Sequence, residues 1–250
     1  MKTSTSKDKE RLDTLLVDRG LADSRQKARA VILAGAVLVE GTRVDKAGAM
    51  IVRDAEIAVT SPACPYVGRG GTKLEGALAE FGIDVSGLVI LDVGASTGGF
   101  TDCLLKKGAG AIYALDVGYG QLDWRLRTDK RVTVMERTNI RQAQKADFGR
   151  EIDGAVIDVS FISLSLVLPA VHGIVRTGGF VIALIKPQFE VGKRDVGKGG
   201  VVKDPEKHRE VIERIAQAAR EIGFEVAGTV QSPLIGPKGN KEFFIYLKKE

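Results

Sequence analysis

The chain has 250 residues, of which 44% are hydrophobic and 28% charged, a composition typical of globular proteins with one large or two smaller domains. A net charge of +5 and a pI of about 9.1 permit a nucleic-acid partner without establishing one. Two distant cysteines exclude a disulfide framework, no His or Cys cluster indicates a metal, and no apolar run approaches the roughly 20 residues that span a bilayer. Residues 1–10 lack the apolar core of a signal peptide, so we expect a cytoplasmic protein.

The first 60 residues have the pattern of a small module. Apolar residues at helical spacing predict a helix over 10–17, and a second helix follows with Asp23 or Ser24 as its cap. A strand and a tight turn are expected at 37–41, and one further short strand within 51–59. Two helices and a small sheet of this size indicate a binding module rather than an enzyme.

Residues 61–67, with two prolines, are expected to link this module to a second domain over 68–250. There, apolar strands alternate with helices, which predicts a parallel sheet covered on both faces. The last two strands are joined by a short loop without a helix, so we expect them to pair antiparallel. The strands are predicted near 88–93, 111–116, 131–135, 154–159, 179–185, 225–231 and 242–247, with a long helix near 205–222.

The first strand of this domain leads into a glycine turn, Gly94-Ala-Ser-Thr-Gly-Gly99, and the next strand ends at Asp116. Such a turn lets a nucleoside approach the backbone, and the carboxylate can accept hydrogen bonds from ribose hydroxyls. The glycine spacing is not that of the dinucleotide fingerprint, which disfavours an NAD-linked dehydrogenase. Asp92 before the turn suits a cationic ligand, so S-adenosylmethionine is the expected cofactor. We expect Gly94, Ala95, Ser96, Thr97, Gly98 and Gly99 to hold it, with Asp116 on its ribose and Asp92 near its ammonium, directly or through water.

One spacing runs through the first module: Arg11-Leu-Asp13, Leu16, Gly20, Ser24-Arg25, Ala28, Ile32, Gly35-x-Val37-x-Val39-x-Gly41 and Lys46. It resembles the alpha-L RNA-binding domain of a small-subunit ribosomal protein, pseudouridine synthases and tyrosyl-tRNA synthetases. One departure is Glu40, where relatives more often have Asn or Asp before the glycine of the turn. The resemblance implies RNA binding through phosphate contacts, against the alternative of a solvated helix face. The expected RNA-binding residues are Arg11, Arg25, Lys27, Arg29, Arg43 and Lys46.

Four ionisable residues stand where the sheet of the second domain would converge on a ligand. Asp158 and Lys186 end two apolar strands, at the edge where open α/β sheets bind ligands. Lys73 follows a glycine pair on the helix that leads into the sheet, and Glu242 opens the final strand. Three of them have an ordinary alternative: a surface lysine for Lys73, a helix cap for Asp158 and an outward strand position for Glu242. Lys186 is harder to dismiss, because Pro187 fixes its backbone.

In this order, Lys73, Asp158, Lys186 and Glu242 resemble the Lys-Asp-Lys-Glu tetrad of FtsJ-type ribose 2′-O-methyltransferases. With the alpha-L domain in front, residues 11–248 resemble the TlyA family of hemolysin A-like ribosomal RNA methyltransferases. This implies a Rossmann-like S-adenosylmethionine methyltransferase sheet (an α/β fold) behind a small α+β RNA-binding domain. The phrases that carry the match are Arg69-Gly-Gly-Thr-Lys-Leu74, Asp92-Val-Gly-Ala-Ser-Thr-Gly-Gly-Phe-Thr101, Asp116-Val-Gly-Tyr-Gly-Gln-Leu122, Lys186-Pro-Gln-Phe-Glu190 and Val196-Gly-Lys-Gly-Gly-Val-Val202.

The resemblance implies methylation of ribosomal RNA in ribosomal subunits, at cytidine. Two neighbouring ammonium groups repel, which favours loss of a proton from one, and we assign the role of base to Lys186. Lys73 would then stabilise charge on the ribose oxygen, Asp158 would steady the lysine pair, and Glu242 would orient Lys73 or the ribose. Phe161 either stacks on a base or packs in the core.

Two features of the second domain carry weaker expectations. The glycine-rich loop 190–202, with Lys193 and Lys198, either closes over the RNA or is an ordinary surface loop. His172 and His208 are expected to be surface or packing residues. An RNA-binding assembly factor with little turnover and a membrane-damaging hemolysin stay as alternatives to the enzyme, and the lack of an amphipathic or spanning segment disfavours the second.

Overall fold

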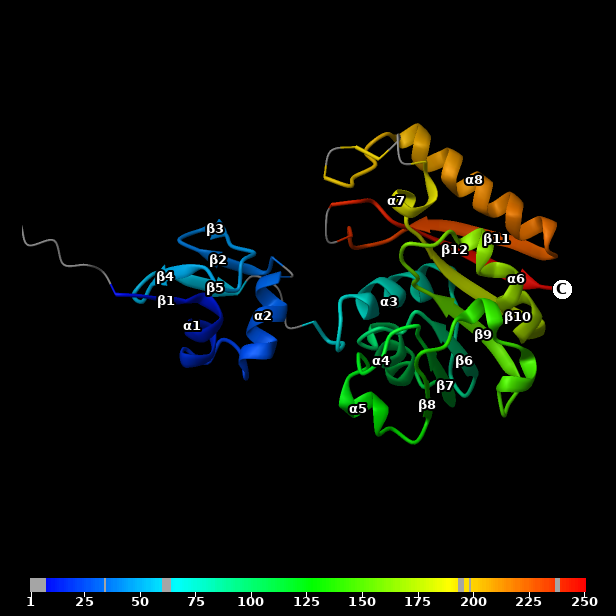
Figure 1. Ribbon diagram of the computed structural model, residues 1–250, viewed down its shortest axis with the longest axis horizontal. Helices are drawn as coiled ribbons and strands as arrows, with labels where there is room; N and C mark the ends of the chain where they lie inside the picture. The colour runs from blue at the N-terminus through cyan, green and yellow to red at the C-terminus, as the bar shows by residue number, and fades with distance from the viewer. Residues whose placement is uncertain (1–7, 34, 60–63, 193–195, 198, 237–238) are drawn as a thin grey trace, which may run out of the picture. The chain divides into compact units, whose positions relative to one another are not determined.

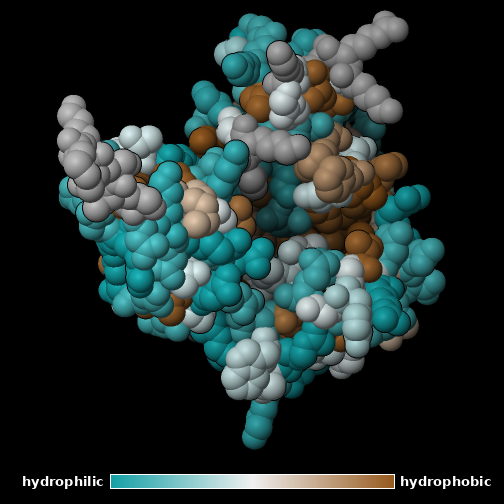
Figure 2. All heavy atoms as spheres, turned by 60° about the vertical axis from the view of Figure 1, so that its left-hand side comes forward, coloured by the Kyte–Doolittle hydropathy of each residue, from teal (hydrophilic) through white to brown (hydrophobic). Residues whose placement is uncertain are grey.

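A computed structural model describes residues 8–33, 35–59, 64–192, 196–197, 199–236 and 239–250 of the chain. The chain forms two compact units, Met1–Pro65 and Tyr66–Glu250, which are described separately below (Figure 1). The space-filling view shows a largely hydrophilic surface interrupted by hydrophobic patches (Figure 2).

The first unit packs two helices, α1 (Leu12–Asp18) and α2 (Arg25–Leu33), against short strands. The predicted helices are confirmed, and the hydroxyl of Ser24 accepts a hydrogen bond from the Lys27 N–H, as an N-terminal cap does. The region 51–59 holds two strands instead of one, β4 (Met50–Val52) and β5 (Ile57–Val59), because a turn interrupts it. An unpredicted strand, β1 (Lys9–Arg11), pairs antiparallel with β4.

The predicted strand and tight turn of this unit form a hairpin between β2 (Val37–Val39) and β3 (Thr42–Arg43), and β5 pairs with the other edge of β2. Glu40 and Gly41 both have positive φ, 49° and 72°, as a type I′ turn requires. Glu40 adopts this conformation although Asn or Asp would do so at lower cost. Its carboxylate accepts from the Glu56 N–H at 2.9 Å, which ties the turn to the start of β5.

The second unit is built on a seven-stranded sheet of order β11-β12-β10-β9-β6-β7-β8. The pairings from β10 to β8 are parallel, and β12 runs antiparallel to both of its neighbours. The expected α/β sheet and the antiparallel final pair are therefore confirmed. The strands are β6 (Val89–Val93), β7 (Ala111–Leu115), β8 (Val132–Met135), β9 (Ile152–Ile157), β10 (Val175–Ile185), β11 (Phe224–Gln231) and β12 (Phe243–Lys249).

Helices cover both faces of this sheet. Apolar residues alternate along each strand between two cores: in β6, Ile90 packs with one and Leu91 with the other. One core contains α3 (Gly70–Phe81), α4 (Gly99–Lys106) and α5 (Trp124–Arg127). The other contains α6 (Leu168–Ile174) and α8 (Pro205–Glu221), and α8 lies along β11 (Figure 1). Short turns of helix complete the unit: η1 (Ile140–Gln142), η2 (Lys145–Asp147), η3 (Leu164–Leu166) and α7 (Pro187–Glu190).

The segment expected to link the domains is only partly described, because residues 60–63 lie outside the described residues. Tyr66 and Val67, which the sequence places in the linker, pack in the second unit. Tyr66 is buried beside Gly71, and the Val67 N–H donates to the Asp102 carboxylate at 2.8 Å. The exact domain limits stay a prediction.

Candidate active site

A pocket of about 520 Å³ opens at the carboxyl ends of the parallel strands. Three neighbouring strands bring side chains to it. Asp158 follows β9, Lys186 follows β10, and Glu242 precedes β12, whose antiparallel direction places its start at the same edge. Lys73 enters from the first turn of α3. The pocket lining includes all four.

The four side chains form two ion pairs. Lys73 pairs with Glu242, and both side chains are buried, with 8% and 1% exposed. Lys186 Nζ lies 2.5 Å from the Asp158 carboxylate. A paired carboxylate stabilises the charged form of an ammonium, so the arrangement balances two positive with two negative charges. The structure thus brings together the four residues that the sequence singled out.

The glycine turn forms another wall of the pocket, through Gly94, Ala95, Ser96, Thr97 and Gly99. Gly94 has φ +84°, and a Cβ there would lie 2.6 Å from the carbonyl oxygen of Asp158. Only glycine fits, because the chain leaving β9 passes directly over the turn. This close approach brings the turn and the ion-paired side chains into one cavity.

Gly98, within the turn, and Asp92 and Asp116, which adjoin it, do not line the pocket. The Asp116 carboxylate accepts from the Ser96 N–H at 2.8 Å and from the Gly118 N–H at 2.7 Å, so it joins the glycine turn to the loop after β7. Asp92 is fully buried and accepts from the Thr101 hydroxyl at 2.6 Å. Burial raises the pKa of Asp92 to about 7, with smaller contributions from Asp158 and Asp116. The other carboxylate oxygen of Asp92, Oδ1, is buried without a hydrogen-bond partner among the described residues.

Three residues that sequence reasoning missed support the site. The Ser160 hydroxyl accepts from Lys186 Nζ at 2.9 Å. The Glu190 carboxylate, whose pKa burial raises, accepts from the Ser163 hydroxyl at 2.7 Å and so ties α7 to the segment after β9. The available signals in the sequence were the motif Lys186-Pro-Gln-Phe-Glu190, which contains Glu190, and the position of Ser160 two residues after Asp158.

The third is Asn240, which is buried and lines the pocket. Its side-chain oxygen accepts from the Val202 N–H and its amide donates to the Gly200 carbonyl, both at 2.9 Å. These bonds hold the end of the glycine-rich loop beside Glu242. Lys193 and Lys198 of that loop lie outside the described residues.

Phe161 is 90% exposed, so it is not a core residue. It has φ +64°, which is unusual for a bulky residue, and its ring lies 4.7 Å from that of Phe189 on the rim of the pocket. His208 is buried against the Val202 carbonyl, and His172 packs edge-on against Phe224, as expected of packing residues. Within the described part of the chain, no group of His, Cys, Asp or Glu could hold a metal ion.

The basic residues of the first unit have mixed surroundings. Arg11 and Arg25 both pair with the buried Asp13, at 2.9 and 3.2 Å, and this holds the pKa of that carboxyl well below its usual range. Lys27 pairs with Asp23 on the surface. Arg11 and Arg25 therefore stabilise the unit, although both side chains remain about half exposed.

Comparisons with known proteins agree with this geometry. The model of the FtsJ-like methyltransferase family matches residues 66–249, and that of the S4 domain, another name for the alpha-L domain, matches residues 10–57. The 16S/23S rRNA (cytidine-2′-O)-methyltransferase TlyA of Mycobacterium tuberculosis is 48% identical, over 96% of this chain and 90% of its own. Hemolysin A of Brachyspira hyodysenteriae is 41% identical, over 94% and 98%.

A solved structure of a provisionally named hemolysin from Streptococcus thermophilus superposes with a TM-score of 0.77 at 44% identity, covering 98% of this chain and 90% of that one. An S-adenosylmethionine-dependent methyltransferase from Mesorhizobium loti, at 15% identity and a TM-score of 0.53, covers 71% of this chain and 98% of its own and shares the fold alone. The chain belongs to the TlyA family of FtsJ-like methyltransferases and carries an S4 domain in front of the methyltransferase domain.

Proposed function

We propose that this protein transfers a methyl group from S-adenosylmethionine to the ribose 2′-hydroxyl of a cytidine in ribosomal RNA, acting on ribosomal subunits in the cytoplasm. The observation that carries the proposal is the convergence of two lysine–carboxylate pairs on one pocket beside the glycine turn. The name of the Mycobacterium tuberculosis relative, a 16S/23S rRNA (cytidine-2′-O)-methyltransferase, supports both the reaction and the substrate.

The pocket fits the proposed cofactor. The glycine turn exposes backbone at Gly94 where no side chain could stand, and it leads into the amino end of α4, whose N–H groups favour polar ligand atoms. Asp116, fixed beside the turn, would accept from the cofactor's ribose. When bound, S-adenosylmethionine supplies a methyl group activated by its positively charged sulfur.

The chain's own residues would position and deprotonate the ribose. Lys186, in its neutral form, would accept the proton of the 2′-hydroxyl, with the Ser160 hydroxyl and the Asp158 carboxylate keeping its Nζ in place. Lys73, oriented by Glu242, would stabilise negative charge developing on the oxygen. Both side chains of the Lys73–Glu242 pair are buried, which holds Lys73 in a fixed place. Positioning of the reacting groups would provide most of the rate acceleration.

The S4 domain would bind the RNA electrostatically through Arg25, Lys27, Arg29, Arg43 and Lys46, together with Arg11. Phe161, exposed on the rim, would stack on a base of the nucleotide that enters the pocket. Phosphate contacts of this kind predict an affinity that falls steeply with salt concentration.

A membrane-damaging activity is the second candidate, since one relative is named hemolysin A. None of the helices in the described residues is long and apolar enough to cross a membrane. Dye release from liposomes by the purified protein would favour this activity. An assembly factor with little turnover is the third candidate, and retention of cellular function by a methylation-dead Lys186→Ala variant would favour it.

The test is methylation in vitro: the protein and labelled S-adenosylmethionine are added to separated ribosomal subunits from a strain that lacks this protein. Label that survives alkaline hydrolysis in a dinucleotide supports the proposal, because a methylated 2′-oxygen cannot attack its own phosphodiester. Lys186→Ala should abolish incorporation. The matched control is Lys145→Ala, which removes an exposed lysine outside the pocket lining and should leave the rate unchanged. Label on a base would refute the proposal.

A further inference from the structure

The connection between β7 and β8 exposes an unusual set of apolar side chains. Val117, Tyr119 and Trp124 are 71%, 69% and 71% exposed, although large aromatic residues are mostly buried. The guanidinium of Arg137 covers one face of Tyr119, 4.2 Å from the ring centroid. The Trp124 ring has no aromatic or cationic partner among the described residues.

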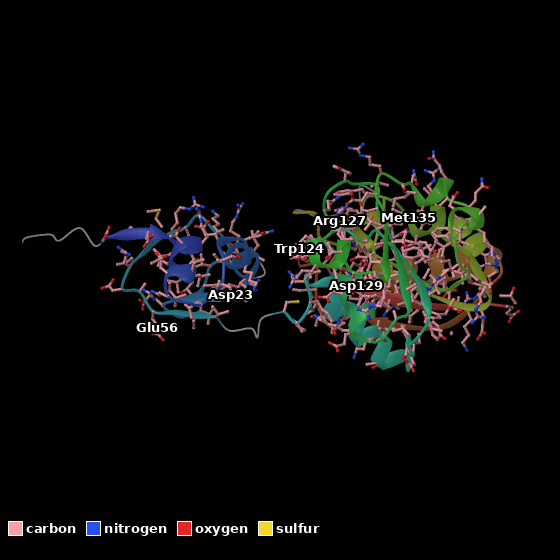
Figure 3. The ribbon with its side chains drawn as sticks, turned by 90° about the horizontal axis from the view of Figure 1, so that it is seen from below. Asp23, Glu56, Trp124, Arg127, Asp129 and Met135 are labelled. Atoms are coloured by element: carbon pink, nitrogen blue, oxygen red, sulfur yellow. The ribbon has the colours of Figure 1, made fainter. Side chains whose placement is uncertain are left out.

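Trp124 is held outward by a well-fixed element. It is the first residue of α5, and the Asp123 side chain caps this helix by accepting from the Arg125 N–H at 2.9 Å. Leu126, on the other side of the helix, is buried, and a Cβ on Gly98 would overlap it. Leu126 and the Asp123 cap therefore hold α5 in place, and the tryptophan ring stays exposed. Figure 3 shows Trp124 and Arg127 on this helix at the margin of the second unit.

The surroundings of Trp124 carry positive charge. Residues 117–141 contain six basic and three acidic side chains, in a chain whose net charge is +5. Arg125, Arg127 and Arg131 pair with the three carboxylates, which leaves the excess on Lys130, Arg137 and Arg141. A flat aromatic ring among cations is what unpaired RNA requires for stacking and phosphate contacts. Trp, Tyr and Arg are also enriched at protein–protein interfaces, whereas Lys is depleted there, so Lys130 and the net positive charge of this surface favour RNA.

This surface adjoins the pocket. The loop that carries Trp124 leaves the carboxyl end of β7, so it lies at the same edge of the sheet as Asp158 and Lys186. The Asp123 N–H donates to the carbonyl of Thr97, a residue of the pocket wall, at 3.2 Å. A strand of RNA with one ribose in the pocket can therefore reach α5 with a nearby nucleotide.

We propose that Trp124 is a stacking platform for an unpaired base of the RNA substrate, next to but outside the nucleotide that is methylated. This inference rests on the proposed function, because it takes the substrate to be RNA. The platform adds affinity and helps to fix which nucleotide enters the pocket, and it takes no part in methyl transfer.

Trp124 is the only tryptophan of the chain, so its fluorescence reports on this surface alone. We would titrate the full chain with a ribosomal RNA fragment containing an unpaired loop, at low and high salt, and in a separate arm with S-adenosylmethionine. RNA should quench the fluorescence. Trp124→Ala should weaken binding by about 5- to 100-fold and raise KM with kcat at saturating RNA unchanged, and Trp124→Phe should restore most of the affinity. Leu166→Ala, which removes another exposed apolar side chain of this unit, should bind normally.

Several outcomes would overturn the platform: quenching by the cofactor but not by RNA, unchanged RNA affinity in Trp124→Ala, or a dimer that this variant dissociates. Thermal unfolding of Trp124→Ala checks that the chain stays folded, as expected from the packing of α5 on Leu126. If the variant methylates and binds as the wild type does, the platform fails and the proposed function stands. If RNA quenches Trp124 but no methyl is transferred to ribose, the proposed function fails and the platform stands.

Discussion

The buried ion pair between Lys73 and Glu242 makes a quantitative prediction. Glu242→Gln leaves the Lys73 ammonium, 8% exposed, without its carboxylate. Removing one partner of a buried pair costs about 3–5 kcal/mol, because the remaining charge is uncompensated. For a unit of this size each kcal/mol lowers Tm by about 2–4 °C, so the transition of the second unit should fall by about 6–20 °C. Lys73→Met combined with Glu242→Gln removes the charge as well and should recover most of this loss.

Calorimetry of the full chain measures the effect, and the transition of the first unit, which contains neither substitution, serves as the internal reference. Methyl transfer should be lost in the single and the double variants alike, since the double variant restores stability without restoring the ammonium. The reasoning is refuted if Glu242→Gln unfolds at the wild-type temperature, or if the double variant is as unstable as the sum of the two single ones.

Three further predictions concern the surroundings of the pocket. The pKa of Asp92 is about 7 in the folded protein and about 4 in the unfolded chain, so between these pH values only the folded protein holds the proton. The free energy of unfolding should therefore fall as pH rises through this range, by at most about 4 kcal/mol. Urea unfolding at pH 5 and pH 8 should show a smaller fall in Asp92→Asn than in the wild type, and an equal fall would contradict the assignment. Gly98→Ala places a Cβ 2.2 Å from Leu126 Cδ1 on a backbone with φ +97°. We expect the free energy of unfolding to fall by about 1–3 kcal/mol, seen as a lower Tm, and calorimetry to show weaker cofactor binding. An unchanged Tm together with unchanged cofactor affinity would contradict this expectation. Glu190→Gln weakens the acceptor of two hydrogen bonds and should lower the free energy of unfolding by about 1–3 kcal/mol. It should also lower kcat more than it changes KM. Wild-type kinetics would show that the link between α7 and the segment after β9 is dispensable.

The strand ends that carry Asp158 and Lys186 could be predicted because apolar runs buried on both faces mark central strands, and their carboxyl ends meet at one edge. Glu242 could be placed at that edge because the loop before β12 is short. The pairing of Lys73 with Glu242 and of Lys186 with Asp158 could not be predicted, since it depends on segments that lie 28 to 169 residues apart and on the sheet order.

Other parts of the site depended on local packing that no sequence pattern encodes. Asp92 was expected near the cofactor, and this stays a prediction. One of its carboxylate oxygens accepts from the Thr101 hydroxyl, a bond that no sequence pattern indicates, and the other is buried without a hydrogen-bond partner in the part of the chain that the structure describes. Phe161 had two open alternatives, and the structure shows its ring exposed and its backbone in the left-handed conformation, neither of which a sequence pattern indicates. Asn240 gave no signal as an isolated amide, and its role is visible only when Gly200 and Val202 lie beside it.

The most direct measurement is a crystal structure of the full chain with S-adenosylhomocysteine and an RNA oligonucleotide that contains the target cytidine. We expect the 2′-oxygen of that cytidine within hydrogen-bond distance of Lys186 Nζ and close to Lys73, facing the sulfur of the cofactor product. A ribose held elsewhere, or a base nitrogen facing the sulfur, would contradict it.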